Sequence, residues 1–239
     1  PVVVTAPSQL PRQPLPFAGR DPELDLLDEA LRPGPDTAGA VVLVGEGEVG
    51  KTALGLSWAH RNADRFPDGQ LHADLHDRTG APVDPGAVLD RFLRALGVRT
   101  IPVDFAEKVA LYRSSVAHRR VLVFLDNAAD SAQVLPLLPG GAHCRVIVTG
   151  RGPLDDLVVR HGAHRLFVEP LRPDESWELL VMLVGQDWVA QQPHEARRLA
   201  SAADGNPLSL RTAAARLWPP PGQGRSERGR SGRGRLAAA

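Results

Sequence analysis

Cysteine, long apolar runs and a leader pattern are scarce or missing in this sequence, and each absence excludes a class of protein. The single cysteine, Cys144, cannot form an internal disulfide, which fits a reducing compartment. The longest apolar runs, such as Ala40–Val44, are strand-sized and far short of the roughly 20 residues that span a bilayer. No charged segment followed by an apolar one begins the sequence, so no secretory signal is visible. We therefore expect a cytoplasmic protein without a membrane span.

Lysine is almost absent, although charge as a whole is ordinary. The 239 residues include 28 Lys and Arg against 28 Asp and Glu, so the net charge gives no electrostatic argument for a nucleic-acid or membrane partner. Apolar residues make up 43% and charged residues 23%, which excludes a wholly disordered chain. The only two lysines are Lys51 and Lys108. Because Lys51 lies in a glycine-rich segment of a chain that otherwise uses arginine, it is a candidate functional residue.

The composition divides the chain into four segments. Residues 1–16 are rich in proline and predict an extended linker. Residues 17–169 alternate apolar runs with helical patterns, whereas residues 170–218 show helical patterns only. Residues 219–239 are rich in Pro, Gly, Ser and Arg without an apolar period, which predicts a disordered tail. We thus expect a main domain over 17–169 and a small helical subdomain over 170–218.

The main domain carries the pattern of a parallel sheet. Short β-rich runs occur at Ala40–Val44, Gln70–Leu75, Val121–Leu125, Arg145–Thr149 and Arg165–Val168. Helical patterns lie between them at Gly50–Ala63, Pro85–Leu96, Phe105–Ala117, Ser131–Leu135 and Pro153–Val159, and after them at Asp174–Val184, Pro193–Ala203 and Pro207–Leu217. Strands that alternate with helices indicate an α/β fold with a parallel sheet covered by helices on both faces.

Residues 45–52 read G-E-G-E-V-G-K-T and fit the phosphate-loop pattern G-x-x-x-x-G-K-[ST] between an apolar strand and a helix. Backbone N–H groups of such a loop converge on phosphate oxygens. Lys51 would add a positive charge at the β- and γ-phosphates, and the Thr52 hydroxyl could bind Mg²⁺. The alternative is a glycine-rich turn in which Lys51 is only a solvated cap. The expected nucleotide contacts in this region are Gly45, Gly47, Glu48, Val49, Gly50, Lys51, Thr52 and Ala53.

Two later strands end in side chains that complement this loop. Asp126 follows the apolar run Val121–Leu125 and could hold Mg²⁺ opposite Thr52, although an aspartate at a strand end is often only a turn former. Asn127 cannot take a proton from water as a second acid would, so we expect a weak ATPase at most. Arg151 follows another strand and could sense the γ-phosphate, or could be merely solvated. The residues expected to act on the nucleotide are Lys51, Asp126 and Arg151.

Glu46 and Glu48 place two carboxylates in a loop meant for polyanions. We expect Glu46 to point outward to water. The position of Glu48 lies within several Å of bound phosphates in a loop of this kind, where small residues suit the close approach of the backbone. A carboxylate there is expected to weaken nucleotide binding through charge repulsion.

Taken in order, the motifs resemble the NB-ARC branch of the STAND nucleotide-switch ATPases, and most of all actinobacterial regulators of the SARP (antibiotic regulatory protein) type. The resemblance covers roughly Phe17 to Leu217. It is carried by F-A-G-R at 17–20, the loop at 45–52, F-P-D-G-Q-L at 66–71, L-D-N-A at 125–128, V-T-G-R at 148–151, L-R-P-D-E at 171–175 and G-N-P-L at 205–208. The ordered set is far more specific than any one motif.

The resemblance implies a three-layer P-loop NTPase fold with a five-stranded parallel sheet, followed by a helical subdomain that closes over ATP or ADP. It also implies that Phe17, Gly19 and Arg20 flank the adenine and that Pro207 contacts the base. Gly205, Asn206 and Pro207 would equally form a helix end and a helix start without any ligand. Two departures from the family are Glu48, where a small residue is usual, and the missing winged-helix module.

The function implied by this resemblance is an ATP/ADP-binding switch module of a transcriptional regulator, with slow or negligible hydrolysis and Mg²⁺ held by Thr52 and Asp126. Self-association in the ATP state is a possible consequence, and DNA would be contacted only through domains absent from this chain. The alternative is a degenerate scaffold that acts through protein contacts without effective nucleotide binding. A small-molecule kinase would need a substrate lid with converging arginines and a base, which the sequence does not offer.

Overall fold

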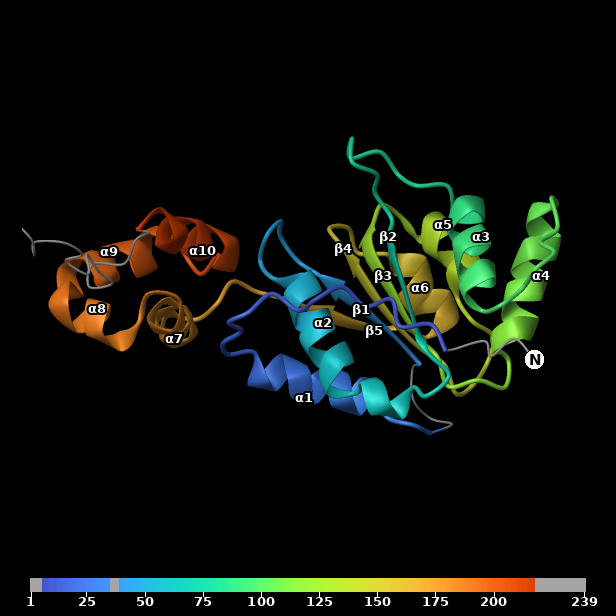
Figure 1. The fold of residues 1–239 in the computed structure, drawn as a ribbon, viewed down its shortest axis with the longest axis horizontal. Coiled ribbons are helices and arrows are strands. Elements are labelled where there is room, and N and C mark those ends of the chain that lie inside the picture. The colour runs from blue at the N-terminus through green and yellow to red at the C-terminus, as the bar shows by residue number, and fades with distance from the viewer. Residues whose placement is uncertain (1–5, 35–38, 218–239) are drawn as a thin grey trace, which may run out of the picture.

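The computed structural model describes residues 6–34 and 39–217 (Figure 1). The expected tail at 219–239 and the first residues of the expected linker lie outside the described residues. Among the described helices, none combines the length and the apolar composition needed to cross a membrane.

A five-stranded, all-parallel sheet forms the centre of the fold, in the order β2-β3-β4-β1-β5. The strands are β1 (Ala40–Val44), β2 (Gln70–Asp74), β3 (Leu122–Ala128), β4 (Arg145–Gly150) and β5 (His164–Phe167). Each lies within two residues of its predicted run, apart from the three-residue extension of β3. The predicted α/β fold class, a P-loop NTPase sheet followed by helices, is confirmed.

Helices cover both faces of the sheet because alternate residues of each strand enter different cores (Figure 1). Helices α1 (Asp21–Ala30) and α2 (Lys51–Arg61) pack on one face, where Val41 and Leu43 of β1 are buried. The other face buries Val42 and Val44. It is covered by α3 (Pro85–Ala95), α4 (Phe105–Val116), α5 (Ser131–Val134) and α6 (Asp155–His161). Short 3₁₀ turns span Ala63–Arg65 and Leu135–Leu137.

Four helices pack around a separate core at one end of the molecule (Figure 1). They are α7 (Pro173–Val184), α8 (Gln186–Gln191), α9 (Pro193–Ala202) and α10 (Pro207–Arg216), and we call them the helical cluster. Helix α8 is missing from the sequence prediction, because six residues after Gly185 are too short to show a helical period. Tertiary packing of Trp188 and Val189 holds it in place.

Residues 6–16, the described part of the segment expected as a linker, are attached to the folded body near both ends of that range. The Gln70 N–H donates to the Pro7 carbonyl at 2.6 Å, and the Gln9 N–H donates to the Gln70 carbonyl at 3.0 Å, so the segment pairs with the edge of β2. Further on, the Arg211 guanidinium donates to the carbonyls of Leu15 and Pro16. Residues 6–16 are thus extended and also connect the sheet edge to α10.

The buried thiol of Cys144 gives a simple test of this packing. Burial raises the pKa of Cys144, and its Sγ donates to the carbonyls of Val116 and Arg119. We expect the native protein to react with a thiol reagent at pH 8 at least roughly 100-fold more slowly than the urea-unfolded chain, since only the thiolate reacts. Absorbance after addition of a chromogenic disulfide measures both rates. Equal rates would contradict the buried position.

Candidate functional site

The phosphate-loop sequence lies between β1 and α2, as the motif predicts. Gly50 precedes the helix with φ 102°, a left-handed conformation that glycine adopts without strain. Gly45 packs closely against the backbone just after β5, where a Cβ on this residue would come within 2.4 Å of the Val168 carbonyl oxygen. The loop therefore needs glycine at its first position for space and at its sixth for conformation.

Lys51 is the first residue of α2 and is only 9% exposed. Its Nζ donates to the carbonyls of Gly45 at 2.9 Å and Glu46 at 2.6 Å. Burial is the main reason why the pKa of Lys51 is lowered, and the charge of Arg151 lowers it further, whereas Asp126 opposes the shift. The ammonium is thus held inside the loop, where burial and the charge of Arg151 outweigh the negative charge of Asp126.

The backbone N–H groups of the loop are free to bind an anion. Within the described parts of the chain, no protein acceptor takes a hydrogen bond from the backbone N–H groups of residues 46–52. They surround the start of α2, where the helix dipole favours negative charge. Together with the buried ammonium of Lys51, this donor set fits a phosphate group.

Asp126 is brought to Thr52 by the end of β3. The Thr52 Oγ1 donates to Asp126 Oδ1 at 2.7 Å, and the Thr149 Oγ1 donates to the same oxygen at 2.5 Å. A hydroxyl and a carboxylate side by side are oxygen ligands of the kind that Mg²⁺ prefers. Sequence reasoning missed Thr149, although it noted the V-T-G-R motif; its place beside Asp126 follows from the pairing of β3 with β4.

Asn127 turns away from this pair of oxygens. It has φ 59° at a break in the register between β3 and β4, and its Nδ2 donates to Asp74 Oδ1 at 3.0 Å. Its N–H donates to Thr149 Oγ1 at 2.9 Å. The amide side chain therefore braces the end of β2 and offers no base at the Asp126 site.

Arg151 is exposed just past the end of β4. Its charge acts on the pKa of Lys51, so the two cations share one end of the sheet. In the described residues it makes no hydrogen bond or ion pair with the protein. Its guanidinium is available for an added anion.

Arg20 is almost fully buried and already bound by the protein. Its Nη2 donates to the Val49 carbonyl at 3.0 Å and its Nη1 pairs with Glu23 Oε1 at 2.8 Å. Its backbone N–H donates to Glu175 Oε1 at 3.0 Å, and the Glu175 side chain also covers Gly19. Phe17 is half-buried against the α1–α2 core. Sequence reasoning noted the motif with Glu175 but did not single out this carboxylate.

Pro207, the first residue of α10, reaches the loop. An ideal Cβ on Gly50 would lie 3.5 Å from its Cγ. The preceding Asn206 caps α10, since its Oδ1 accepts from the N–H groups of Leu208 and Ser209 at 2.9 and 3.0 Å. Pro207 therefore lies beside the loop and at the first helical position at once. Ala53, one turn into α2, is half-buried.

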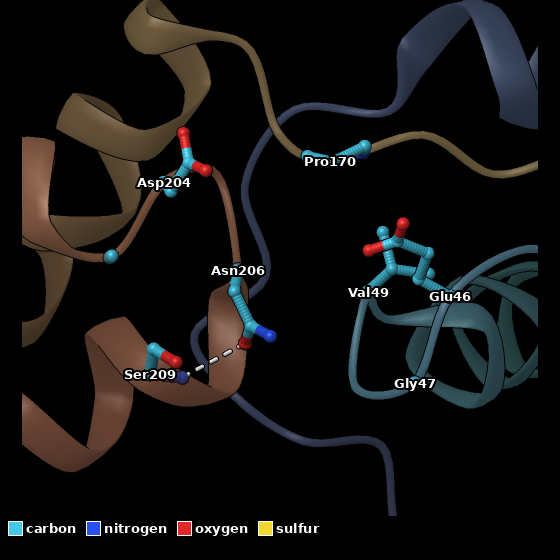
Figure 2. A pocket seen from close by; sticks show the side chains of 8 residues that line it. Glu46, Gly47, Val49, Pro170, Asp204, Asn206 and Ser209 are labelled. Carbon is cyan, nitrogen blue, oxygen red and sulfur yellow. Dashed lines mark hydrogen bonds between the residues drawn. The ribbon is translucent and has the colours of Figure 1, made fainter.

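A cleft of about 280 Å³ separates the loop from the helical cluster (Figure 2). Its lining residues are Glu46, Gly47, Val49, Pro170, Ala203, Asp204, Asn206 and Ser209. Glu46 is exposed to water, and its side chain also lines this cleft. Glu48 is exposed with φ 64° and is not among the lining residues. A turn of the backbone between the two positions, which the motif does not reveal, separates them.

Relatives of this chain are found among regulators. Regulatory protein AfsR of Streptomyces coelicolor is 42% identical over 219 residues, and Regulatory protein AfsR of Streptomyces griseus is 40% identical over 214 residues. Each match covers 88% of this chain and 22% of the relative, so the chain spans about a fifth of the length of these proteins. No family model matches the chain.

Solved structures with a similar fold are P-loop ATPases. A STAND protein with a tetratricopeptide-repeat sensor from Pyrococcus horikoshii superposes with a TM-score of 0.55 at 20% identity, over 85% of this chain and 30% of that one. The AAA domain of FIGL-1, solved with ADP, superposes with a TM-score of 0.50 at 14% identity, over 83% of this chain and 70% of that one. The predicted resemblance is therefore confirmed: the chain has the fold of the STAND-type P-loop ATPases and is similar in sequence to SARP-type regulators of the AfsR kind.

Proposed function

We propose that this chain binds ATP or ADP with Mg²⁺ and acts as a nucleotide-dependent switch module of a cytoplasmic transcriptional regulator. One observation carries the proposal: Lys51, Thr52 and Asp126 meet at a loop of unused N–H donors. The AfsR regulators support the regulatory part. DNA contact would belong to parts of a regulator that this chain does not match, and self-association would follow from the ATP state.

Each residue has a distinct task in this proposal. The N–H groups of the loop and the Lys51 ammonium would hold the β-phosphate and, in ATP, the γ-phosphate. Thr52 and Asp126 would hold Mg²⁺, which neutralises phosphate charge when bound. Arg151, exposed at the same end of the sheet, would respond to the γ-phosphate. Phe17, Gly19 and Pro207 would border the base.

Hydrolysis is proposed to be slow or negligible. Asn127 occupies the position beside Asp126 and its amide is committed to Asp74. An amide does not accept a proton from an attacking water. A module that keeps its nucleotide without cleaving it can report which nucleotide is bound.

The helical cluster is the proposed moving part. Its helices pack on one another around a core that also buries Ala18 of the segment before α1. Further contacts join Glu175 to Gly19 and Arg20, Pro207 to Gly50, and Arg211 to Leu15 and Pro16. Of these contact residues only Ala18, a small side chain, belongs to a hydrophobic core, so the contacts can break while each core stays largely packed. ADP would keep the cluster docked, and ATP would shift the population towards release.

Removal of Mg²⁺ tests the site. We expect the parent chain to bind ATP at least roughly tenfold more tightly with Mg²⁺ than with a chelator, because the ion offsets phosphate charge. Asp126→Asn keeps the size and one oxygen but removes the charge, so most of the Mg²⁺ effect should disappear. Calorimetric titration of ATP measures both, and the exposed Asp187→Asn serves as control. An unchanged Mg²⁺ effect in Asp126→Asn would remove Asp126 from the site.

The two loop carboxylates are expected to differ. Glu46→Gln should raise the affinity for ATP several-fold, and more than the affinity for ADP. The reason is that a charge beside the cleft repels phosphate by about 1 kcal/mol after screening. Glu48→Gln should have the smaller effect on affinity. Glu48→Gly should instead raise thermal stability, because a non-glycine residue at φ 64° costs roughly 1 kcal/mol. Titrations at low and high salt with melting curves measure these effects; a larger affinity gain at position 48 would contradict the assignment.

A further inference from the structure

A buried arginine holds one peptide group of the phosphate loop. Arg20 is 3% exposed, and its Nη2 donates to the Val49 carbonyl at 3.0 Å while Nη1 pairs with Glu23 at 2.8 Å. A guanidinium with two such partners in a buried position is fixed in its rotamer. It is thus engaged by the protein on two sides, which leaves it poorly suited to direct contact with a base.

The hydrogen bond to Val49 fixes the next N–H group as well. The Val49 carbonyl and the Gly50 N–H belong to one planar trans peptide, so they point in opposite directions. While Arg20 holds the carbonyl, the Gly50 N–H points away from Arg20. This N–H is one of the loop donors without a protein acceptor in the described residues.

Arg20 is itself held by the helical cluster. The Arg20 N–H donates to Glu175 Oε1 at 3.0 Å, and the Arg172 N–H donates to Glu175 Oε2 at 2.9 Å. Glu175 is 5% exposed, and the Arg172 guanidinium, which is 57% exposed, lies 3.1 Å from its Oε1. A Cβ on Gly19 would lie 2.6 Å from the Glu175 side chain, so glycine permits this close docking.

We propose that Arg20 and Glu175 are positioning residues that couple the phosphate loop to the helical cluster. Arg20 orients the Val49–Gly50 peptide for phosphate, and Glu175 fixes Arg20 to the first turn of α7. The inference rests on the proposed nucleotide binding and names the connection through which it acts. If nucleotide binding requires the oriented peptide, bound nucleotide favours the docked position of the helical cluster. By linkage, loss of docking weakens nucleotide binding by the same factor.

The test uses conservative variants of the whole chain. Arg20→Lys keeps the charge but cannot reach Val49 and Glu23 together, and we expect about a tenfold loss of ADP affinity. Glu175→Gln keeps the shape with one acceptor oxygen, and we expect a loss of several-fold. Arg172→Gln, which removes only the exposed guanidinium on the same carboxylate, should stay within about twofold because an exposed ion pair contributes little.

Amide hydrogen exchange provides a readout that a merely structural role would not change. In the parent chain, ADP should slow exchange at residues 173–184 as well as at residues 45–52. In Glu175→Gln the protection of residues 173–184 by ADP should be lost, even at saturating ADP. Circular dichroism verifies folding, and Glu175→Gln alone suffices if Arg20→Lys fails to fold.

The outcomes separate this inference from the proposed function. If the parent binds ADP and Lys51→Ala does not, yet folded Arg20→Lys and Glu175→Gln bind like the parent with normal ADP protection, the coupling is wrong and the binding site stands. A lowered melting temperature with unchanged affinity and protection would likewise overturn it, since the pair would then be structural. Absence of ADP binding by the parent would overturn both.

Discussion

Lys51→Ala is expected to weaken ADP binding by roughly 100-fold. A unit charge about 4 Å from a phosphate at an effective dielectric near 20 contributes several kcal/mol, of which about 3 kcal/mol survives partial exposure to water. The fold should persist, because the ammonium donates only to two loop carbonyls, at Gly45 and Glu46. Its lowered pKa indicates that the charge is disfavoured by burial before any ligand binds.

The other lysine of the chain is the matched control. Lys108 lies on α4, where its Nζ pairs with Asp90 Oδ1 at 2.8 Å. Lys108→Ala should bind ADP like the parent. Calorimetric titration of the three proteins, with circular dichroism for the fold, gives the comparison. Equal ADP affinity in the parent and in folded Lys51→Ala would place the nucleotide elsewhere.

Arg145→Ala is expected to lower the free energy of unfolding of the main domain by about 3–5 kcal/mol, a large share of the stability of a typical domain. Arg145 is 4% exposed and its guanidinium donates to the carbonyls of Leu31, Arg32, Ala142 and Cys144. It thereby joins the end of α1 to the start of β4. Its removal leaves several carbonyls in or near the core without this donor.

Urea unfolding followed by tryptophan fluorescence measures the effect, since Trp58 is buried in the α1–α2 core together with Leu31, whose carbonyl Arg145 binds. Arg145→Met, which keeps the apolar stem, should recover only a minor part of the loss. Arg197→Ala, at an exposed position of α9, should change stability by less than about 0.5 kcal/mol. A loss in Arg145→Ala no larger than in Arg197→Ala would contradict the role of the four carbonyls.

The sheet and the loop could be predicted because their signals are local. Ala40–Val44 is continuously apolar and is followed at once by the glycine-lysine pattern, so strand, loop and helix each appear in the order of the residues. The same holds for α10, where Asn206 and Pro207 form a helix start within two positions. Periodicity and capping chemistry suffice for such elements.

Contacts between distant residues could not be predicted in this way. Glu175 meets Arg20 across 155 positions, and Thr149 meets Asp126 across 23, so both pairs depend on how the elements assemble. The linker prediction overlooked the pairing of Pro7 and Gln9 with the sheet edge, because a proline-rich strip shows no strand alternation. Glu46 and Glu48 were distinguished by a backbone turn and not by residue type.

Equilibrium binding of a fluorescent ADP analogue to the purified chain, with and without Mg²⁺, tests the central claim most directly. The claim is that an adenine nucleotide binds at residues 45–52 beside the helical cluster. The account predicts saturable binding at one site, displaced by unlabelled ADP and ATP and lost in Lys51→Ala. Absence of saturable binding by the folded chain would contradict it and would favour a scaffold that keeps the fold without the nucleotide.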